Sequence, residues 1–238
     1  MKHKRVNVLC IKHGSLYSHE YVNRLFNMVS RHCSLPFNFY CITENTTNIN
    51  PEISCLPLPN IPVSGWWFKP YIFSKHLPFK GPVLYLDLDL VIVDNIDKLF
   101  SYEPKKLCTI RDFVRVQSSS WKRFNSSVMR FSANKYSYIW ESFAGDIRRN
   151  TQRFRGDQDY LYHVASNAGV CYPDEWIKSY KWEIRKSGKV DITQPKNERQ
   201  FKVVETNIKT PNECCIAAFH GDPRPHNCLD PYIINNWI

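Results

Sequence analysis

Apolar residues alternate between short continuous runs and helical spacing along the first part of the chain. Val6 to Ile11 is a short run rich in β-forming residues, which predicts a strand. The segment from Tyr21 to Val29 then carries apolar residues at the spacing of one helix face. Pro36 to Ile42 alternates as a second strand, and Ile53 to Leu58 predicts a third before prolines interrupt it. The pattern indicates a strand that leads into a helix and then into further strands.

The most apolar segment of the chain runs from Pro82 to Val93. Within it, Val83 to Leu86 is continuously apolar, which is typical of a strand buried on both faces of a parallel sheet. Before it, Lys69 to Leu77 predicts a short helix that accommodates Pro70 in its first turn. Further elements are expected as strands at Leu107–Ile110, Ser127–Phe131 and Cys215–Phe219 and as helices at Lys135–Gly145 and Asp157–Ala165. The segment from Lys178 to Asn212 has no clear period, and no element is assigned to it.

Strands that alternate with helices predict an α/β fold. No linker rich in Ser, Gly or charged residues divides the chain, so residues 1–238 are expected to form a single domain. The aromatic content of 14% excludes a disordered chain, because this many rings can bury enough surface to offset the loss of conformational entropy.

The sequence shows no segment expected to enter or cross a membrane. The apolar segment from Pro82 to Val93 falls short of the roughly 20 residues that span a bilayer, and the basic start is followed by too few apolar residues for a signal peptide. The expected location is therefore the cytoplasm. The nine cysteines include no Cys-x-x-Cys pair, so they are expected to be reduced thiols rather than disulfides or zinc ligands.

The formal net charge is +10, and it is unevenly distributed along the sequence. Segments 115–155 and 178–209 are basic, whereas 156–177 contains four acidic residues and no Lys or Arg. A basic surface with one acidic pocket favours an anionic ligand together with a cation, or peripheral contact with the anionic inner face of a membrane. Nucleic acid is not expected as a partner, because the basic residues form no helical stripe and no known module accompanies them.

Two carboxylates interrupt the apolar segment. Asp87 and Asp89 follow the buried strand Val83–Leu86, where an unpaired charge is costly, so the fold has to supply a cation, hydrogen-bond donors or access to solvent. In an extended chain both side chains point to the same side, and ligands of open α/β sheets collect at the carboxyl ends of strands. Oxygen ligands suit Mg²⁺ or Mn²⁺. The alternative is an exposed strand end with both acids in water.

The run from Phe68 to Phe100, with Asp87-Leu-Asp89 at its centre, resembles the donor-site core of GT-A glycosyltransferases, in particular glycosyltransferase family 8. Asn125-Ser126-Ser127 resembles the Asn-Ser-Gly donor loop of that family, and Gly156-Asp157-Gln158 resembles its Gly-Asp-Gln. His220 to Pro225 resembles its terminal His … Gly-x-x-Lys-Pro motif. Because these segments occur in the family's order across nearly the whole chain, they are more specific together than any one alone. Ser127 in place of Gly and Arg224 in place of Lys indicate a divergent bacterial or phage-like branch.

The resemblance implies a GT-A-like, Rossmann-like domain with a mixed, mainly parallel central sheet, and it implies roles for individual residues. Asp87, Asp89 and His220 would bind a Mn²⁺ or Mg²⁺ ion. Asp157 and Gln158 would face the transferred sugar as the catalytic pair, although an acid that opens a helix is also a plain cap. The donor nucleotide sugar would be bound by Tyr17, Lys69, Asp87, Asn125, Ser126 and Arg224, with Lys69 and Arg224 as cations beside its phosphates.

The function implied by the resemblance is metal-dependent transfer of a hexose from a nucleotide sugar, expected to be UDP-linked, to a glycan or glycolipid acceptor with retention of configuration. Two alternatives remain open. The same acids would serve a nucleotidyltransferase or a metal-dependent phosphohydrolase, and the chain would also suit a non-catalytic module that binds sugar nucleotides or glycans. The aromatic run Trp66-Trp67-Phe68 has two interpretations, a wall for an acceptor sugar or part of the core.

Overall fold

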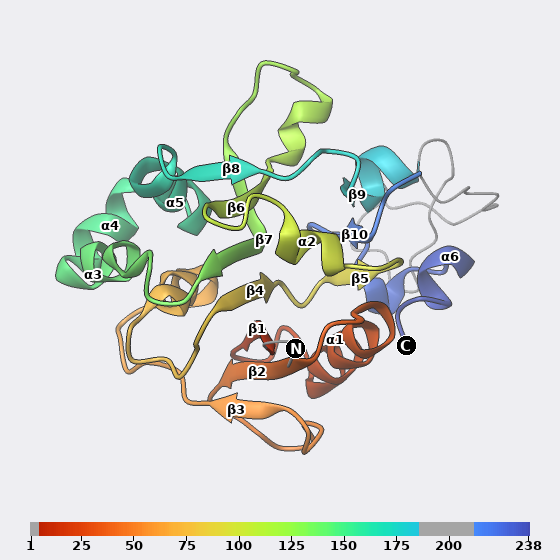
Figure 1. Ribbon diagram of the computed structural model, residues 1–238, viewed down its shortest axis with the longest axis horizontal. Helices are drawn as coiled ribbons and strands as arrows, with labels where there is room; N and C mark the ends of the chain where they lie inside the picture. Colours follow the sequence, from red (N-terminus) through yellow and green to blue (C-terminus); the bar gives the residue numbers. More distant parts are fainter. Residues whose placement is uncertain (1–4, 186–211) are drawn as a thin grey trace.

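The computed structural model describes residues 5–185 and 212–238 and is built around a seven-stranded sheet with the order β3-β2-β1-β4-β7-β6-β8 (Figure 1). Its strands are β1 (Val6–Lys12), β2 (Phe37–Thr43), β3 (Ser54–Leu56), β4 (Pro82–Leu86), β6 (Leu107–Arg111), β7 (Phe124–Ser132) and β8 (Gly169–Cys171). The first four pair in parallel, β6 pairs in parallel with β8, and β7 runs antiparallel to both of its neighbours. The expected α/β fold with a mixed, mainly parallel sheet is confirmed.

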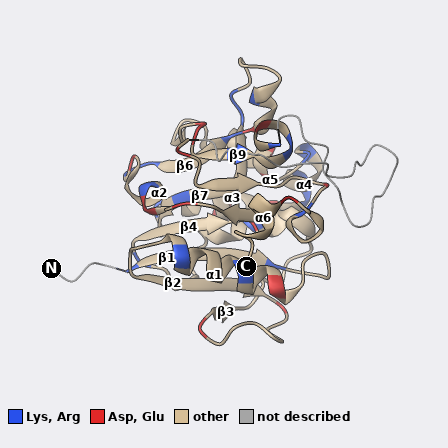
Figure 2. Ribbon diagram, turned by 90° about the vertical axis from the view of Figure 1, so that its right-hand side faces the viewer, with Lys and Arg blue, Asp and Glu red and all other residues tan. Residues whose placement is uncertain are grey.

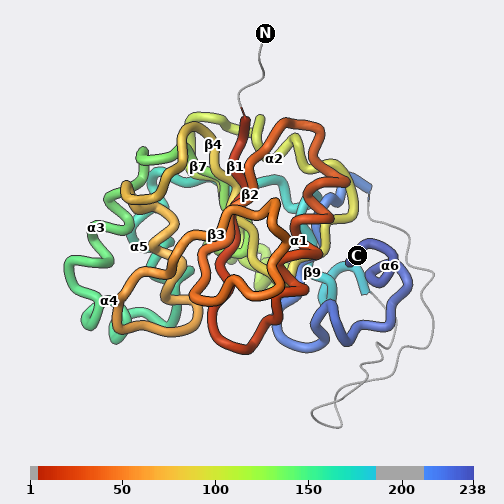
Figure 3. Tube along the Cα trace, turned by 90° about the horizontal axis from the view of Figure 1, so that it is seen from below, coloured from red at the N-terminus to blue at the C-terminus, as the bar shows by residue number. Residues whose placement is uncertain are grey.

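Helices cover both faces of this sheet. Figures 1 and 3 show α1 (His19–His32) on one side and α3 (Ser137–Gly145), α4 (Ile147–Arg153) and α5 (Asp157–Ala165) on the other. Short helices α2 (Asp97–Ser101) and α6 (Pro231–Ile234) complete the α-helical elements of the described chain. Successive strand residues face opposite sides of the sheet. Val8 and Cys10 pack with the residues of α1, whereas Leu9 packs with those of α3 and α5. Strands buried on both faces explain the continuous apolar runs in the sequence.

A second, three-stranded sheet adjoins the first. It has the order β5-β10-β9 and consists of β5 (Leu90–Ile92), β9 (Ile177–Ser179) and β10 (Ile216–Ala218). The strand predicted at Cys215–Phe219 is observed as β10, but it lies in this second sheet and not in the central sheet that contains β4. The reason is local, because the chain turns at Leu88 and Asp89 after β4 and leaves the central sheet before β5 begins.

Several expected boundaries also differ. The helix expected at Lys69–Leu77 is a 3₁₀ helix, η1 (Gly65–Phe73), which begins earlier at a glycine with a φ of 62°. Within the unassigned segment 178–212, the described part contains the end of β9 and the single π-helical turn η3 (Tyr180–Ile184). Most of that segment lies outside the described residues. Short elements such as β5, α2 and α4 have too few residues to show a period.

Two global expectations concern membranes and cysteines. Across residues 5–185 and 212–238, no helix combines the length and the apolar character that crossing a bilayer requires. All nine cysteines lie within these ranges, and each is a free thiol, most of them buried in the core.

Candidate active site

The strand pairings explain why distant segments meet at one edge of the central sheet. Parallel strands β1 and β4 both end there, so the loop after β1 lies beside Asp87, which follows β4. Antiparallel β7 starts at the same edge: Leu86 pairs with Val128, and the Asp87 amide donates to the Ser127 carbonyl at 2.8 Å. Residues 125–127 are thereby positioned next to the β4 end. This is the crevice in which ligands of open α/β sheets bind.

The small sheet brings the end of the chain to the same place. Leu90 pairs with Ala218 in antiparallel register, and the Phe219 amide donates to the Asp89 carbonyl at 3.1 Å. His220 therefore lies near Asp89, although the two are far apart in the sequence. β9 runs beside β10 with Ser179 opposite Ala218, which brings Ser179 to His220.

A pocket of about 500 Å³ opens at this edge. Every residue that the sequence proposed for the site lines it, namely Tyr17, Lys69, Asp87, Asp89, Asn125, Ser126, Asp157, Gln158, His220 and Arg224. Its rim also includes the large apolar side chains of Leu16, Trp66 and Phe68. The roles assigned to these residues stay predictions, but their convergence on one pocket comes from the fold.

Lys69 lies at the centre of a buried polar cluster on the pocket floor. Its Nζ is 3.0 Å from Asp87 Oδ1 and 3.4 Å from Asp157 Oδ2, and it donates to Ser126 Oγ at 3.0 Å. Ser126 in turn donates to Asp157 at 2.5 Å, and the hydroxyl of Tyr85 donates to Asp87 at 2.6 Å. One cation therefore joins two acids from different elements.

This cluster sets the charge state of its members. Burial alone would lower the pKa of Lys69, but the carboxylates of Asp157 and Asp87 reverse that effect and hold its pKa above the usual value. Burial raises the pKa of Asp157, and Lys69 and the Ser126 hydroxyl oppose the rise. Lys69 is consequently a firmly charged group that neutralises acids, which the sequence, expecting a cation beside donor phosphates, did not indicate.

Among the described residues, Asp89 has no such cationic partner. Burial and the nearby charge of Asp87 raise its pKa to about 7, although the Tyr17 hydroxyl donates to Asp89 Oδ2 at 2.9 Å. Burial and the Asp89 charge in turn raise the pKa of Tyr17, so its phenol stays protonated. The pocket thus presents one carboxylate with no cation at hydrogen-bonding distance among the described residues, where added positive charge would be favourable.

His220 is held by three side chains. Its Nε2 shares a hydrogen bond of 2.7 Å with Ser179 Oγ, the Phe113 ring stacks on it at 5.2 Å, and Trp182 meets it edge-on at 4.6 Å. Burial and the neighbouring Lys181 lower the pKa of His220 to about 4. The imidazole is therefore neutral near pH 7, the form that binds metals.

The residues fit a divalent ion only in part. Asp87 and Asp89 offer carboxylate oxygens to one pocket, which matches the way Mg²⁺ and Mn²⁺ are held by one or two carboxylates together with substrate phosphates. Within the described part of the chain, however, no three side chains of His, Cys, Asp or Glu gather closely enough to form a metal cluster. The joint ligation of one ion by Asp87, Asp89 and His220 stays a prediction.

The remaining predicted residues make more local contacts. The Arg224 guanidinium lies 5.3 Å from the centre of the Tyr17 ring. Asn125 Oδ1 accepts from the Ser127 amide at 2.9 Å and so stabilises the start of β7. Gln158 Nε2 donates to Asp112 Oδ2 at 3.1 Å, which ties the start of α5 to the loop after β6.

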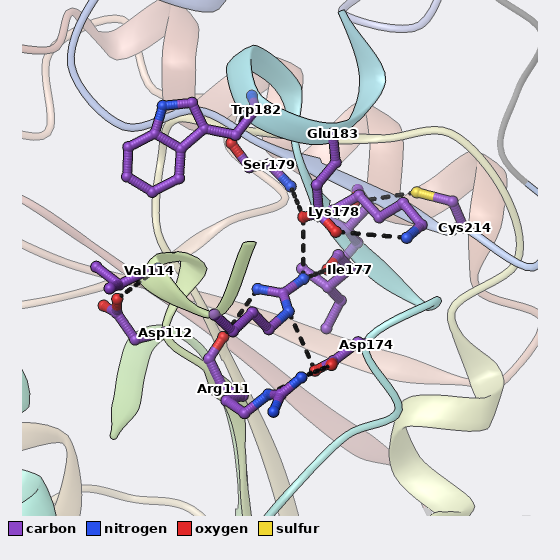
Figure 4. A network of polar contacts seen from close by, with 12 residues as sticks. Arg111, Asp112, Val114, Asp174, Ile177, Lys178, Ser179, Trp182, Glu183 and Cys214 are labelled. Atoms are coloured by element: carbon purple, nitrogen blue, oxygen red, sulfur yellow. Dashed lines mark hydrogen bonds and ion pairs between the residues drawn. The ribbon is translucent and has the colours of Figure 1, made fainter. Parts of the chain in front are cut away.

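A charged network behind His220 was not expected from the sequence. Buried Arg115 contacts Glu183 Oε2 at 2.9 Å and Asp174 Oδ1 at 3.2 Å. Glu183 also accepts from the Ser179 amide at 2.8 Å (Figure 4). The Arg115 guanidinium lies 5.0 Å from the Phe113 ring, which stacks on His220. Because these partners come from separate segments, only the tertiary structure connects them to the pocket.

We expect Arg115→Met to lower the free energy of unfolding by about 2 kcal/mol, because it removes a buried cation while Lys178 and Arg111 still face the two acids. Arg111→Met is the control, since among the described residues its half-buried side chain pairs with a single acid, Asp174, and otherwise donates to the Ser119 carbonyl, and it should cost less than about 1 kcal/mol. Urea denaturation of both variants measures the difference. Equal losses would show that Arg115 is not the centre of the network.

The four acids of segment 156–177 do not form the single acidic pocket suggested by their sequence clustering. Asp157 alone lines the pocket. Asp159 pairs with Arg123 and Arg155, Asp174 pairs with Arg111 and Arg115, and Glu175 is exposed. Figure 2 shows Lys and Arg on widely separated elements. Sequence proximity misled here because two of these acids lie on α5 and the other two lie in the loop after β8, where they have different neighbours.

The aromatic run after Gly65 divides into separate environments. Trp67 packs in the core and stacks on Phe143 at 5.7 Å with an angle of 14° between the rings. Phe68 lines the pocket near His13. Trp66 also lines the pocket, yet 58% of its surface remains exposed. The core interpretation therefore fits Trp67, whereas the acceptor-wall interpretation stays a prediction for Trp66 and Phe68.

Comparison with known proteins finds similarity in structure but not in sequence. No protein-family model matches the chain, and no curated protein matches it. A crystal structure of the galactosyltransferase LgtC in complex with donor and acceptor sugar analogues superposes with a TM-score of 0.67 at 12% identity, covering 97% of this chain and 93% of LgtC. The glycosyltransferase GlyE of Streptococcus pneumoniae superposes with a TM-score of 0.65 at 15% identity, covering 98% of this chain and 62% of GlyE.

A third similar structure is the bifunctional glycosyltransferase WbbM, with a TM-score of 0.61 at 13% identity, covering 98% of this chain and 49% of WbbM. Identities this low establish the fold and leave the substrates undetermined. The shared region includes almost all of the chain and hence the sheet edge that carries the pocket. The chain therefore has the GT-A, Rossmann-like fold of these glycosyltransferases.

Proposed function

We propose that the protein is a glycosyltransferase that moves a hexose from a nucleotide sugar to a glycan or glycolipid acceptor. The observation that carries this proposal is the convergence on one pocket of ten residues named from the sequence, at the ligand-binding edge of a GT-A sheet. The galactosyltransferase LgtC, which shares this fold, was crystallised with donor and acceptor sugar analogues. A UDP-linked hexose is the donor that we expect.

The proposed roles of the pocket residues follow from their charge and chemistry. Arg224 and the divalent ion would face the diphosphate, and the Tyr17 ring would contact the nucleotide base, since aromatic rings stack on any nucleobase. Asp157 and Gln158 would bind the hydroxyls of the transferred hexose. Lys69 would balance the charge of the Asp87 and Asp157 carboxylates and hold them in position, so that they act as acceptors for donor hydroxyls.

A divalent metal is part of this proposal. Asp87 and Asp89 would hold Mn²⁺ or Mg²⁺, with His220 as a further ligand. The ion would neutralise the negative charge that develops on the nucleoside diphosphate as it leaves. Two properties of the residues support this: Asp89 needs a compensating cation, and His220 is neutral near pH 7.

We further propose that transfer occurs with retention of configuration and that the enzyme acts in the cytoplasm, where basic residues would favour acceptors carrying phosphate or a place at the inner membrane face. Retention rests on the motif resemblance, and Asp157 as a base that activates the acceptor would instead give inversion. The anomeric coupling constant of the new linkage, measured by NMR, decides between them, and a product opposite in configuration to the donor contradicts retention.

A hydrolysis panel of nucleotide sugars tests the proposed function. We expect release of a nucleoside diphosphate from a hexose donor in the presence of Mn²⁺ or Mg²⁺ and loss of this activity in chelator. Asp157→Asn should reduce turnover by about 100-fold, because it removes a charge aimed at the reacting sugar. Asp159→Asn, two positions along the same helix, is the matched control, since Asp159 is paired with Arg123 and Arg155.

The alternatives give different products in the same panel. A nucleotidyltransferase releases pyrophosphate from nucleoside triphosphates, and a phosphohydrolase cleaves phosphomonoesters, while a non-catalytic module binds donor without turnover. Any of these outcomes, or equal binding of UDP with and without divalent metal in calorimetry, would contradict the proposal.

A further inference from the structure

The pocket has two chemically different parts. Its floor contains the buried charged cluster around Lys69, and its rim on one side is apolar, formed by Leu16 and Trp66. These two side chains are 59% and 58% exposed, among the most exposed large apolar residues of the described chain. Exposed apolar side chains gathered at the mouth of a polar pocket are typical of a ligand-binding surface rather than of a core.

Trp66 is fixed directly beside the proposed catalytic residues. A Cβ atom added to Gly156 would lie 3.3 Å from Trp66 Nε1, so the edge of the indole approaches the backbone that precedes Asp157. Gly156 has an extended backbone with a φ of −173°, so the conformation itself does not require glycine. Instead, the absence of a side chain at Gly156 allows the indole to approach the backbone closely.

We infer that Trp66 is the stacking platform for a pyranose ring of the acceptor, and this inference rests on the proposed transferase function. A pyranose has an apolar face of C–H groups and an edge of hydroxyls. The aromatic face attracts the partly positive C–H groups and buries apolar area, while the hydroxyls stay free for polar partners. Leu16 supplies a second apolar surface on the opposite loop, after β1.

The position of Trp66 favours the acceptor over the donor. The residues of the proposed donor site include Lys69, Ser126 and Asp157, which are buried on the floor. A donor seated there leaves the rim beside Asp157 open to solvent, and an acceptor has to approach the reacting carbon from that side. Within residues 5–185 and 212–238, no aromatic ring stacks on Trp66, so among those residues its face is free of aromatic partners.

Kinetics of transfer test this inference on the full-length enzyme. Trp66→Ala should raise the acceptor KM by about tenfold and lower the ratio of transfer to donor hydrolysis by a similar factor, because a stacked ring contributes apolar burial and quadrupole attraction. Trp66→Phe should retain most of the affinity. Tyr138→Ala is the control, since Tyr138 is an aromatic residue of α3 with 42% exposure that lies outside the pocket lining. An unchanged acceptor KM in Trp66→Ala would overturn the inference.

A binding experiment separates failure of the platform from failure of the transferase. The chain has seven tryptophans, and Trp66→Phe identifies the Trp66 indole N–H signal in an NMR spectrum. Cellobiose, maltose and lactose at millimolar concentrations are the probes, and at least one should shift the Trp66 signal selectively. If none does, or if only UDP shifts it, Trp66 is not an acceptor platform. The hydrolysis panel of nucleotide sugars tests the transferase function independently of the Trp66 signal.

Discussion

Lys69→Met is expected to abolish donor turnover and to lower the free energy of unfolding by about 3 kcal/mol at pH 8, because it leaves the buried Asp157 and the partly buried Asp87 without their cation. Lys69 Nζ contacts both Asp87 and Asp157 within 3.4 Å. Without Lys69, the rise in the pKa of Asp157 caused by burial is no longer opposed by this cation, so Asp157 takes up a proton more readily and the loss should shrink as pH falls toward 5. Chemical denaturation at the two pH values, together with donor hydrolysis, measures both effects.

Two further variants make this prediction specific. Lys75→Met removes a lysine that pairs with Glu141 at 2.8 Å on the surface, where both side chains are more than half exposed, and it should change stability by less than about 1 kcal/mol. Combining Lys69→Met with Asp157→Asn removes one of the uncompensated charges and should recover part of the lost stability. If the double variant is as unstable as the sum of the single ones, the ion pair does not explain the effect.

Asp89→Asn is expected to abolish turnover while making the metal-free protein more stable. Burial and the charge of Asp87 raise the pKa of Asp89 to about 7, so the folded protein binds a proton there more tightly than the unfolded chain does. Protonation of Asp89 therefore stabilises the folded protein. This stabilisation is fully present below the unfolded pKa near 4 and is lost as pH rises through about 7. Asparagine carries no charge, so Asp89→Asn removes the cost of holding a buried carboxylate at higher pH.

The stability gain should therefore depend on pH with a known sign. In chelator we expect Asp89→Asn to stabilise the protein by about 2 kcal/mol at pH 8 and by nearly nothing at pH 4. With Mn²⁺ and UDP present, the wild-type protein should instead be more stable than Asp89→Asn, because only the wild-type carboxylate binds the ion. Asp94→Asn, an exposed acid in the same segment, should show neither effect. A gain that is the same at both pH values would contradict the raised pKa.

Much of the fold was readable from local pattern. The continuous apolar run Val83–Leu86 predicted a strand buried on both faces, and β4 (Pro82–Leu86) lies at the centre of the sheet. Helical spacing from Tyr21 to Val29 predicted α1 because its apolar residues all face one side of the sheet. The candidate site residues could also be predicted from the sequence. Charged residues next to apolar strands, and motifs in a fixed order, are visible without knowledge of the fold.

The tertiary structure alone decided which of those residues touch and how each is charged. Lys69 was expected beside phosphates, yet its position between Asp87 and Asp157 depends on strands and a helix that meet only after folding. The acids of 156–177 separated into a pocket residue and surface pairs for the same reason. Trp66 and Trp67 are neighbours in sequence, but one is exposed and the other packs in the core. Periodicity and motif order are properties of the local chain, whereas burial, pairing and pKa depend on non-local neighbours that no local pattern contains.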